Sequence, residues 1–252
     1  MALKMKKLAK ILAKNISQNP TAAVILAAGN STRMGENVNK QTCLVDGFPV
    51  LAHTLMAYQQ CSLIQDIVVV ARPEDFADIY SIAQTYKIKK LRHIVAGGST
   101  RQESAKKGFA KLDAKIKYVA IADGARCLTT PQQIAKIALR AYRYEAASAG
   151  HQISDTVKRA TVTGAVKETV DRTNLWQVQT PQIFHTTLYA AALQKAETDA
   201  FEGTDDNSLL EHMGYQIQLV ECGAENLKIT TPEDLPLAEA ILQYRRRQKS
   251  NQ

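Results

Sequence analysis

The chain has 252 residues, of which 45% are hydrophobic and 22% charged, with a formal net charge of +8. This length and composition are typical of a globular protein with a substantial core, in one large domain or two small ones. The longest apolar runs, such as residues 67–71, are too short to cross a bilayer, so we expect no membrane insertion.

The positive charge is concentrated at the two ends of the chain. Residues 1–20 contain five lysines and no acidic residue, and residues 245–252 add four basic residues. The other 23 basic residues are balanced by 24 acidic ones. Because a nucleic-acid footprint covers a folded surface, this pattern argues against nucleic acid as the main partner. We expect a basic extension (1–20), one folded domain (21–244) and a basic C-terminal tail (245–252).

The N-terminal extension and the cysteines bear on where in the cell the protein is expected. In the N-terminal extension, Leu8, Ile11, Leu12 and Ile16 have helical spacing, with lysines elsewhere. The segment is either a membrane-surface or targeting helix, or a loose extension outside the chemistry. The four cysteines are scattered and form no C-x-x-C pair, which indicates a reducing, cytoplasmic compartment without a disulfide framework or zinc site.

From residue 22 onward, short apolar β-type runs alternate with amphipathic helical segments. We expect strand 22–28, helix 49–60, strand 66–71, helix 73–86, strand 93–95, helix 100–112, strand 118–121 and helix 131–146. Apolar strands that alternate with helices predict an α/β fold with a doubly wound, mostly parallel twisted sheet. Ligands of such sheets bind beyond the carboxyl ends of the strands, where the 27–40 loop, Gly97-Gly98 and Asp123 would meet.

The alternation of apolar strands and amphipathic helices ends after the helix expected at 131–146. Residues 151–173 alternate every second residue around Thr163-Gly164, which predicts a β-hairpin. A two-stranded ribbon is barely stable alone, so it either folds onto its own domain or crosses to a second subunit. Beyond it we expect a helix at 209–211, strands at 216–221 and 227–229, and a closing helix from residue 232.

The loop that follows the first strand has the features of a phosphate site. The strand ends in Ala27-Ala28-Gly29, where backbone N–H groups can face an anion, and Arg33 and Lys40 follow. The loop lacks the lysine–serine/threonine ending of the P-loop, and no G-x-G-x-x-G occurs. The absence of nucleophile motifs points to phosphoryl or nucleotidyl transfer, which depends on fixed cations.

Two charged residues at other predicted strand ends have alternative interpretations. Asp123 is either a ligand of a divalent ion that holds phosphate, or a helix cap or salt-bridge partner of Arg126. Lys228 lies between Leu227 and Ile229, so it either has an anionic partner or occupies the solvent face of an edge strand.

Eight motifs, in order, give the chain a resemblance to a known family. They are LAAGNSTRMG, KQ, GGSTRQES, ADGAR, SDTVKR, VDRTNLWQVQTPQIF, TDDNSLLE and NLKITTPEDL. Together they resemble the 2-C-methyl-D-erythritol 4-phosphate cytidylyltransferases, within the wider Rossmann-like nucleotidyltransferase group. The resemblance covers the chain from about residue 22 to residue 242.

The resemblance implies roles for the residues around the nucleotide. Arg33 and Lys40 match the charge stabilisers of the pentavalent α-phosphate. Asp123 matches an aspartate that faces the metal, Mg²⁺, and the ribose. The positions that hold cytidine and triphosphate are matched by Ala27, Ala28, Gly29, Gly98 and Ser104.

It also implies roles around the acceptor. Arg172 and Lys228 match the pair that grips methylerythritol phosphate, and Arg126 lies near that acceptor. The polar contacts around the substrate are matched by Thr156, Thr180 and Thr204, and we group Asp155 with them. In this family the hairpin arm crosses to the partner subunit, which implies a homodimer with shared sites.

The implied reaction is Mg²⁺-dependent transfer of CMP from CTP to 2-C-methyl-D-erythritol 4-phosphate in the non-mevalonate isoprenoid pathway. Two alternatives are a ribitol-5-phosphate cytidylyltransferase and a degenerate, non-catalytic nucleotide-binding homologue. The chain departs from the usual family residues at Ser31, Asn39, Ala122, Gly124 and Cys127. Cys127 stands in place of the family's proline and Gly124 in place of an alanine, so we expect the loop after Asp123 to be more flexible than usual. This change bears on rate and nucleotide affinity more than on reaction type.

Overall fold

The computed structural model describes residues 17–35 and 38–250. Two short 3-10 helices, η1 and η2, span Thr32–Met34 and Pro73–Asp75. The strands are β1 Thr21–Leu26, β2 Leu44–Val45, β3 Phe48–Pro49, β4 Ile64–Ala71, β5 Leu91–Ala96, β6 Tyr118–Asp123, β7 Ala146–Gln152, β8 Val157–Ala160, β9 Val166–Val170, β10 Trp176–His185 and β11 Gln218–Glu221. The helices are α2 Val50–Gln60, α3 Phe76–Thr85, α4 Arg101–Phe109, α5 Pro131–Tyr144, α6 Thr186–Thr198, α7 Asp206–His212 and α8 Asp234–Ser250.

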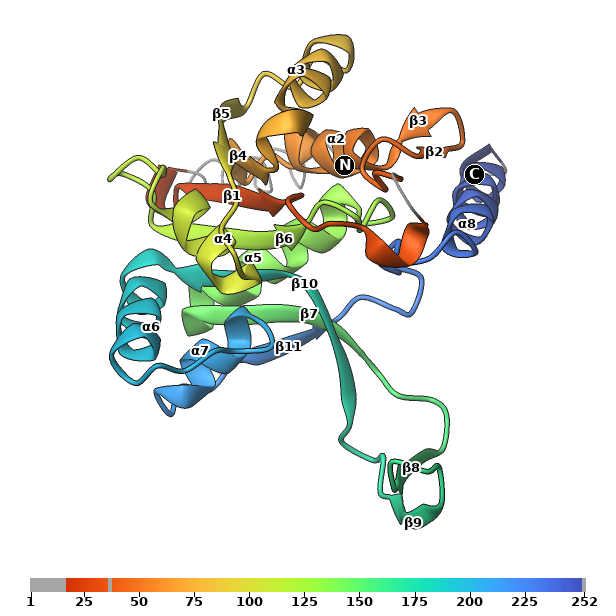
Figure 1. Ribbon diagram of the computed structural model, residues 1–252. Coiled ribbons are helices and arrows are strands. Elements are labelled where there is room, and N and C mark those ends of the chain that lie inside the picture. The colour runs from red at the N-terminus through yellow and green to blue at the C-terminus, as the bar shows by residue number, and fades with distance from the viewer. Residues whose placement is uncertain (1–16, 36–37, 251–252) are drawn as a thin grey trace, which may run out of the picture.

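A seven-stranded sheet forms the centre of the molecule, in the order β11-β7-β10-β6-β1-β4-β5 (Figure 1). β1 pairs in parallel with β4 and β6, β4 with β5, and β7 with β11. β10 alone runs antiparallel to its neighbours β6 and β7. The predicted mostly parallel α/β sheet is therefore confirmed, with one antiparallel strand inserted.

Helices cover both faces of this sheet, because side chains of the central strands point alternately to two cores. On one face, Ala23 and Ile25 of β1 pack in a cluster that includes residues of α2, α3 and α5. On the other face, Val24 packs with residues of α4, α6 and α7. The fold is doubly wound, as predicted from the sequence.

β8 and β9 form an antiparallel hairpin that extends away from the sheet beyond β7 and β10 (Figure 1). The tip is a turn closed by a backbone hydrogen bond from Gly164 to Thr161 at 3.0 Å. Most hairpin residues are exposed, and the side chain of Val162 at the tip has no cover. The predicted hairpin within residues 151–173 is thus present. The segments that connect it to the sheet continue from β7 and lead into β10.

Several elements differ from the sequence prediction, and β2, β3 and β7 are among those that were not expected. No element was expected between the hairpin and residue 209, where β10 and α6 lie. β10 contains Pro181, a residue that usually argues against a central strand. Residues 227–229 do not form the predicted strand; the Ile229 N–H donates to the carbonyl of Ala125, which lies in the loop after β6, at 2.9 Å.

The C-terminal helix α8 packs next to the segment that follows η1. Ala238 shares a buried cluster with Met34 and Val45. The guanidinium of Arg245 donates to the Leu128 carbonyl at 2.7 Å, so residue 245, expected to begin a basic tail, lies inside α8. Residues 1–16, which hold most of the predicted N-terminal extension, lie outside the described residues. Within the described residues, no helix has the length and apolar character of a membrane span.

Candidate active site

A cavity of about 320 Å³ opens at the carboxyl edge of the sheet. Its lining comes from the loop after β1, from Lys40 and Gln41, from the β5–α4 connection, from the end of β6, and from Lys228. The carboxyl ends of parallel strands meet at one edge, so segments far apart in the sequence converge there. The predicted rim is therefore a real cavity.

The β5–α4 connection approaches the loop after β1 very closely. A Cβ on Gly97 would lie only 2.6 Å from the Cβ of Ala28, so this contact requires glycine. The backbone N–H of Gly98 donates to Oγ of Ser104 at 2.9 Å, which ties this connection to the beginning of α4. Thr100 caps α4, and the positive end of that helix faces the cavity.

Glu103, on the solvent side of α4, binds the glycine-rich β5–α4 connection. Its carboxylate accepts hydrogen bonds from the Ser99 N–H and hydroxyl, each at 2.7 Å, and pairs with Lys107 at 3.0 Å. The hydrogen bonds from Ser99 and from Lys107 lower the pKa of Glu103 to about 2. These contacts connect the turn at Ser99 to the first two turns of α4.

Asp123 is a buried carboxylate surrounded by cations. Its oxygens lie 3.0 Å from Nζ of Lys228, 3.4 Å from Nε of Arg126 and 4.0 Å from Nε of Arg101. Burial alone would raise the pKa of Asp123, but the charges of these three residues outweigh it and hold the pKa below its ordinary value. Asp123 is therefore ionised at neutral pH. Of the two alternatives for Lys228, the one with an anionic partner is confirmed, and Asp123 forms the salt bridge with Arg126 that the sequence allowed.

Lys40 is the second lysine of the cavity. Its ammonium is half-buried, and burial lowers its pKa. The charge of Lys228 lowers this pKa further, while Asp123 opposes the change. Two lysines around one carboxylate leave a surplus of positive charge, which favours a phosphate ligand in this cavity.

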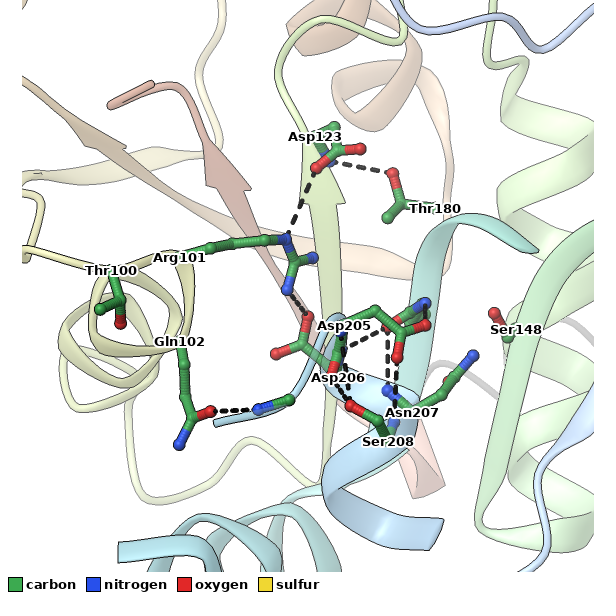
Figure 2. Close-up of polar contacts among 12 residues, drawn as sticks. Thr100, Arg101, Gln102, Asp123, Ser148, Thr180, Asp205, Asp206, Asn207 and Ser208 are labelled. Atoms are coloured by element: carbon green, nitrogen blue, oxygen red, sulfur yellow. Dashed lines mark hydrogen bonds and ion pairs between the residues drawn. The ribbon is translucent and has the colours of Figure 1, made fainter. Parts of the chain in front are cut away.

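A second buried carboxylate, Asp206, holds Arg101 in place (Figure 2). The guanidinium of Arg101 donates to Oδ2 of Asp206 at 2.6 Å, and the hydroxyl of Tyr189 donates to Oδ1 at 2.6 Å. The Asp206 N–H donates to Oε1 of Gln182 at 3.0 Å. Asp205 caps α7 by accepting from the Ser208 N–H, so the start of this helix is fixed as well.

Asn226 connects Arg126, next to the cavity, to β10. Its side-chain amide donates to the Thr180 carbonyl at 3.1 Å, and its backbone carbonyl accepts from the Arg126 guanidinium at 2.6 Å. The Thr180 hydroxyl in turn accepts a hydrogen bond from the Asp123 N–H at 3.0 Å. Thr180 and Arg126 therefore lie directly beside Asp123.

The structure brings together part of the set that the sequence predicts. The predicted residues that line the cavity are Ala28, Gly29, Lys40, Gly98, Ser104, Asp123 and Lys228. Ala27 lies behind them, with its N–H bonded to the Val70 carbonyl at 2.7 Å. Arg33 is exposed on η1, and neither it nor Thr204, which is also exposed, lines the cavity.

The residues predicted on the arm lie elsewhere in this subunit. Asp155, Thr156 and Arg172 are exposed beside β8 and β9, and none lines the cavity. The guanidinium of Arg172 donates to the Ser154 carbonyl within the arm.

Arg101, Gln41 and Asp206 are polar residues of the site that the sequence prediction did not single out. Arg101 and Gln41 line the cavity. Each lies inside a motif that the sequence analysis noted: Arg101 in GGSTRQES, Gln41 in KQ and Asp206 in TDDNSLLE. The signal for Arg101 was its place directly after a glycine-rich turn at a predicted helix start. Nothing in the sequence indicated that its partner would be Asp206.

The described residues of the cavity provide only some of the ligands that a divalent ion needs. In the described chain, no three His, Cys, Asp or Glu side chains group to bind a metal by themselves. Of the described residues that line the cavity, Asp123 alone carries a carboxylate. Mg²⁺ commonly binds one or two carboxylates and completes its shell with substrate phosphates and water. Asp123 fits that kind of site, with the phosphates of a bound nucleotide as the other ligands.

A doubly wound sheet with a cationic cavity at its carboxyl edge is typical of nucleotide-binding α/β proteins. The model of one family, 2-C-methyl-D-erythritol 4-phosphate cytidylyltransferase, matches residues 21–244. The chain therefore belongs to this family of cytidylyltransferases, as the sequence resemblance implied.

Individual relatives agree with the family match. The chain is 41% identical over 222 residues to the 2-C-methyl-D-erythritol 4-phosphate cytidylyltransferase of Caldanaerobacter subterraneus, covering 88% of this chain and 98% of that protein. It is 42% identical over 227 residues to the enzyme of the same name from Halalkalibacterium halodurans, covering 90% and 98%. The crystal structure of 4-diphosphocytidyl-2C-methyl-D-erythritol synthase from Anaerococcus prevotii superposes with a TM-score of 0.80 at 29% identity, covering 91% of this chain and 99% of that one.

Proposed function

We propose that this protein transfers CMP from CTP to 2-C-methyl-D-erythritol 4-phosphate, with release of pyrophosphate. The observation that carries the proposal is the cavity in which Lys40, Lys228 and Asp123 meet the glycine-rich connection before α4. Family membership supplies the reaction, and this geometry supplies groups suited to it.

In the proposed reaction, an oxygen of the acceptor phosphate attacks the α-phosphorus of CTP, and the bond to the pyrophosphate leaving group breaks. A phosphate monoester is already ionised at neutral pH, so the protein has no proton to remove. Its contribution is to position the two substrates and to stabilise charge on the α-phosphate. We assign that stabilisation to Lys40 and Arg33.

The remaining residues divide between nucleotide and acceptor. Backbone and side-chain groups of the loops before η1 and α4 would hold the nucleotide; they belong to Ala27, Ala28, Gly29, Gly98 and Ser104. The phosphate of the acceptor would bind near Lys228 and Arg126, beside Thr180. Lys228 is already paired with Asp123 at 3.0 Å, so an acceptor phosphate would share this lysine.

We further propose that the enzyme depends on Mg²⁺. Asp123 would hold the ion together with phosphate oxygens, and the ion would neutralise charge on the triphosphate as the leaving group departs. Without it, the cavity offers two lysines and Arg101 to the negative charges of the triphosphate.

The arm suggests a homodimer with shared active sites. Arg172, Thr156, Asp155 and the exposed Thr204 do not line the cavity of their own subunit, although the family resemblance gives them acceptor contacts. We propose that the β8–β9 arm of one subunit brings Arg172, Thr156 and Asp155 to the cavity of its partner. The exposed Val162 and Val166 on this arm would then be covered by the second subunit.

A pyrophosphate-release assay tests the proposed function. With Mg²⁺ and 2-C-methyl-D-erythritol 4-phosphate, we expect release from CTP and much less from ATP, GTP or UTP. Ribitol 5-phosphate in place of the acceptor should give little release. A clear preference for ribitol 5-phosphate would contradict the proposed acceptor, and failure to bind CTP in calorimetry would contradict catalysis at this cavity altogether.

A further inference from the structure

The side chain of Asn39, the residue before Lys40, makes two hydrogen bonds in the turn that carries this lysine. Its Nδ2 donates to Oδ1 of Asp75 at 2.9 Å, and its Oδ1 accepts from the Gln41 N–H at 3.0 Å. The second bond is the kind with which asparagine closes a turn over its own backbone. One side chain therefore shapes the turn that carries Lys40 and ties this turn to a distant element.

The distant element is a rigid one. Asp75 ends η2 and is only 7% exposed. Its two oxygens accept hydrogen bonds from Nε and Nη2 of Arg72, each at 2.8 Å, in a bidentate pair. Arg72 directly follows β4, the strand next to β1 in the centre of the sheet. The chain Asn39–Asp75–Arg72 thus connects the lysine turn to the central sheet.

On its other side, the turn is held by the backbone. The Gln41 carbonyl accepts from the Leu51 N–H at 3.0 Å, and the Cys43 carbonyl accepts from the Val50 N–H at 2.9 Å. The Lys40 N–H itself reaches only Oγ of Ser31 at 3.4 Å, a long contact of little strength. Asp75 is therefore the strong side-chain anchor on the N-terminal side of Lys40.

Lys40 needs such an anchor because its surroundings are unfavourable. Its ammonium is half-buried, and burial and the charges of Lys228 and Arg33 lower its pKa more than the charges of Asp123 and Asp234 raise it. A long flexible side chain on a loose turn would relieve both penalties by moving toward solvent. Held at the cavity, the same charge is available to a phosphate.

We propose that Asn39 is a positioning residue for Lys40, and that the hydrogen-bonded chain Asn39–Asp75–Arg72 fixes this lysine at the cavity. The proposal rests on the role given to Lys40 in the proposed function. A charge that stabilises the transition state loses effect when it is displaced, so the consequence falls on kcat rather than on CTP binding.

Four variants test the proposal in the pyrophosphate-release assay. Asn39→Ala should lower kcat about tenfold and leave KM for CTP within about threefold. Asn39→Asp should lower kcat further, because two carboxylates would then face each other. The double variant Asn39→Asp/Asp75→Asn restores a donor and an acceptor between these two positions, but it breaks one of the two hydrogen bonds from Arg72, so kcat should recover in part and exceed that of Asn39→Asp. The matched control Thr42→Val removes a 3.0 Å hydroxyl bond to the Asn39 carbonyl in the same turn, and should leave kcat unchanged.

A measurement without substrate separates this proposal from the proposed function. NMR titration of the Lys40 side chain should give a higher pKa in Asn39→Ala than in wild type, since a released ammonium leaves its buried site and the charge of Lys228, which together outweigh the opposing charges of Asp123 and Asp234. Thr42→Val should keep the wild-type value. An Asn39→Ala variant that folds with an unchanged Lys40 pKa and unchanged kcat overturns the proposal, as does a double variant no better than Asn39→Asp. If wild type releases no pyrophosphate, the titration still decides the positioning role.

Discussion

At the scale of single residues, the site is an arrangement of charges around Asp123. The cations Lys228, Arg126 and Arg101 keep this carboxylate ionised despite its burial. Burial, and after it the charge of Lys228, disfavours the charged form of Lys40, whose pKa is lowered. Because the positive groups outnumber the carboxylates in the cavity, it is prepared for a polyanion before any ligand arrives.

The lowered pKa of Lys40 predicts a pH dependence. A lysine with a lowered pKa loses its proton at lower pH, so kcat/KM should fall with rising pH at a midpoint below 10.5, the ordinary lysine value. An arginine at this position keeps its charge throughout this range. In Lys40→Arg the fall of kcat/KM at alkaline pH should therefore move to higher pH, and the maximum of kcat/KM should be lower than in wild type. An unchanged alkaline limb in Lys40→Arg would contradict the assigned role.

The Arg101–Asp206 pair predicts a stability effect. Asp206→Ala leaves the Arg101 guanidinium and the Tyr189 hydroxyl without their shared acceptor. Since the Asp206 side chain is only 1% exposed and that of Arg101 32%, we expect a loss of about 2–4 kcal/mol in the free energy of unfolding. Urea titration measures it. Asp206→Asn keeps an acceptor and should lose clearly less; equal losses in the two variants would show that this pairing is not the cause.

At the scale of elements, the close approach of α4 to the sheet positions the nucleotide side of the cavity. Gly108 of α4 lies against Val24 of β1 and Val70 of β4, and a Cβ there would lie 2.6 Å from Cγ2 of Val70. The glycine-rich connection before α4 can reach the β1 loop because the helix lies so near the strands.

This packing predicts the effect of Gly108→Ala. Helix propensity alone would favour alanine by about 1 kcal/mol, but overpacking against two valines costs about 1–3 kcal/mol. We expect a net loss of stability in thermal unfolding. The same change in a Val24→Ala background should cost less, because the shortened side chain leaves room. A Gly108→Ala protein more stable than wild type would contradict the close packing.

The sequence predicted most elements because the apolar strands of the first half follow one another with little ambiguity. β4 and β6 are apolar over nearly their whole length, and buried strands of this kind are distinctive. β10 was not predicted because Pro181 interrupts it. Lys228 was assigned to a strand from its apolar neighbours, yet its partner Asp123 lies 105 positions earlier in the sequence. Pairings between distant segments, including Arg101 with Asp206, depend on the tertiary fold and leave no local pattern.

At the scale of the whole molecule, the compact sheet and the projecting arm have different roles in the account. The body contains the cavity, whereas the arm carries exposed polar residues that the cavity lacks. If the arm completes the partner's site, each active site is formed by two chains. Size-exclusion chromatography should then give a dimer.

Subunit mixing tests this sharing. Lys40→Ala disables the body of a site and Arg172→Ala disables the arm, so each variant alone should be nearly inactive. In a mixed population about half of the dimers are heterodimers, each with one intact site, and activity should return to about a quarter of wild type. No recovery on mixing, with both variants folded and dimeric, would mean that Arg172 serves its own subunit or no site.

The most direct test of the central claim follows the oxygen atoms of the acceptor phosphate. The enzyme is incubated with CTP, Mg²⁺ and 2-C-methyl-D-erythritol 4-phosphate labelled with ¹⁸O in the phosphate, and the products are examined by ³¹P NMR. The account predicts a cytidine diphosphate product that retains all of the label, one ¹⁸O in its bridge, together with unlabelled pyrophosphate. Label in the pyrophosphate, or no cytidine diphosphate product, would contradict attack of the acceptor phosphate on the α-phosphorus of CTP.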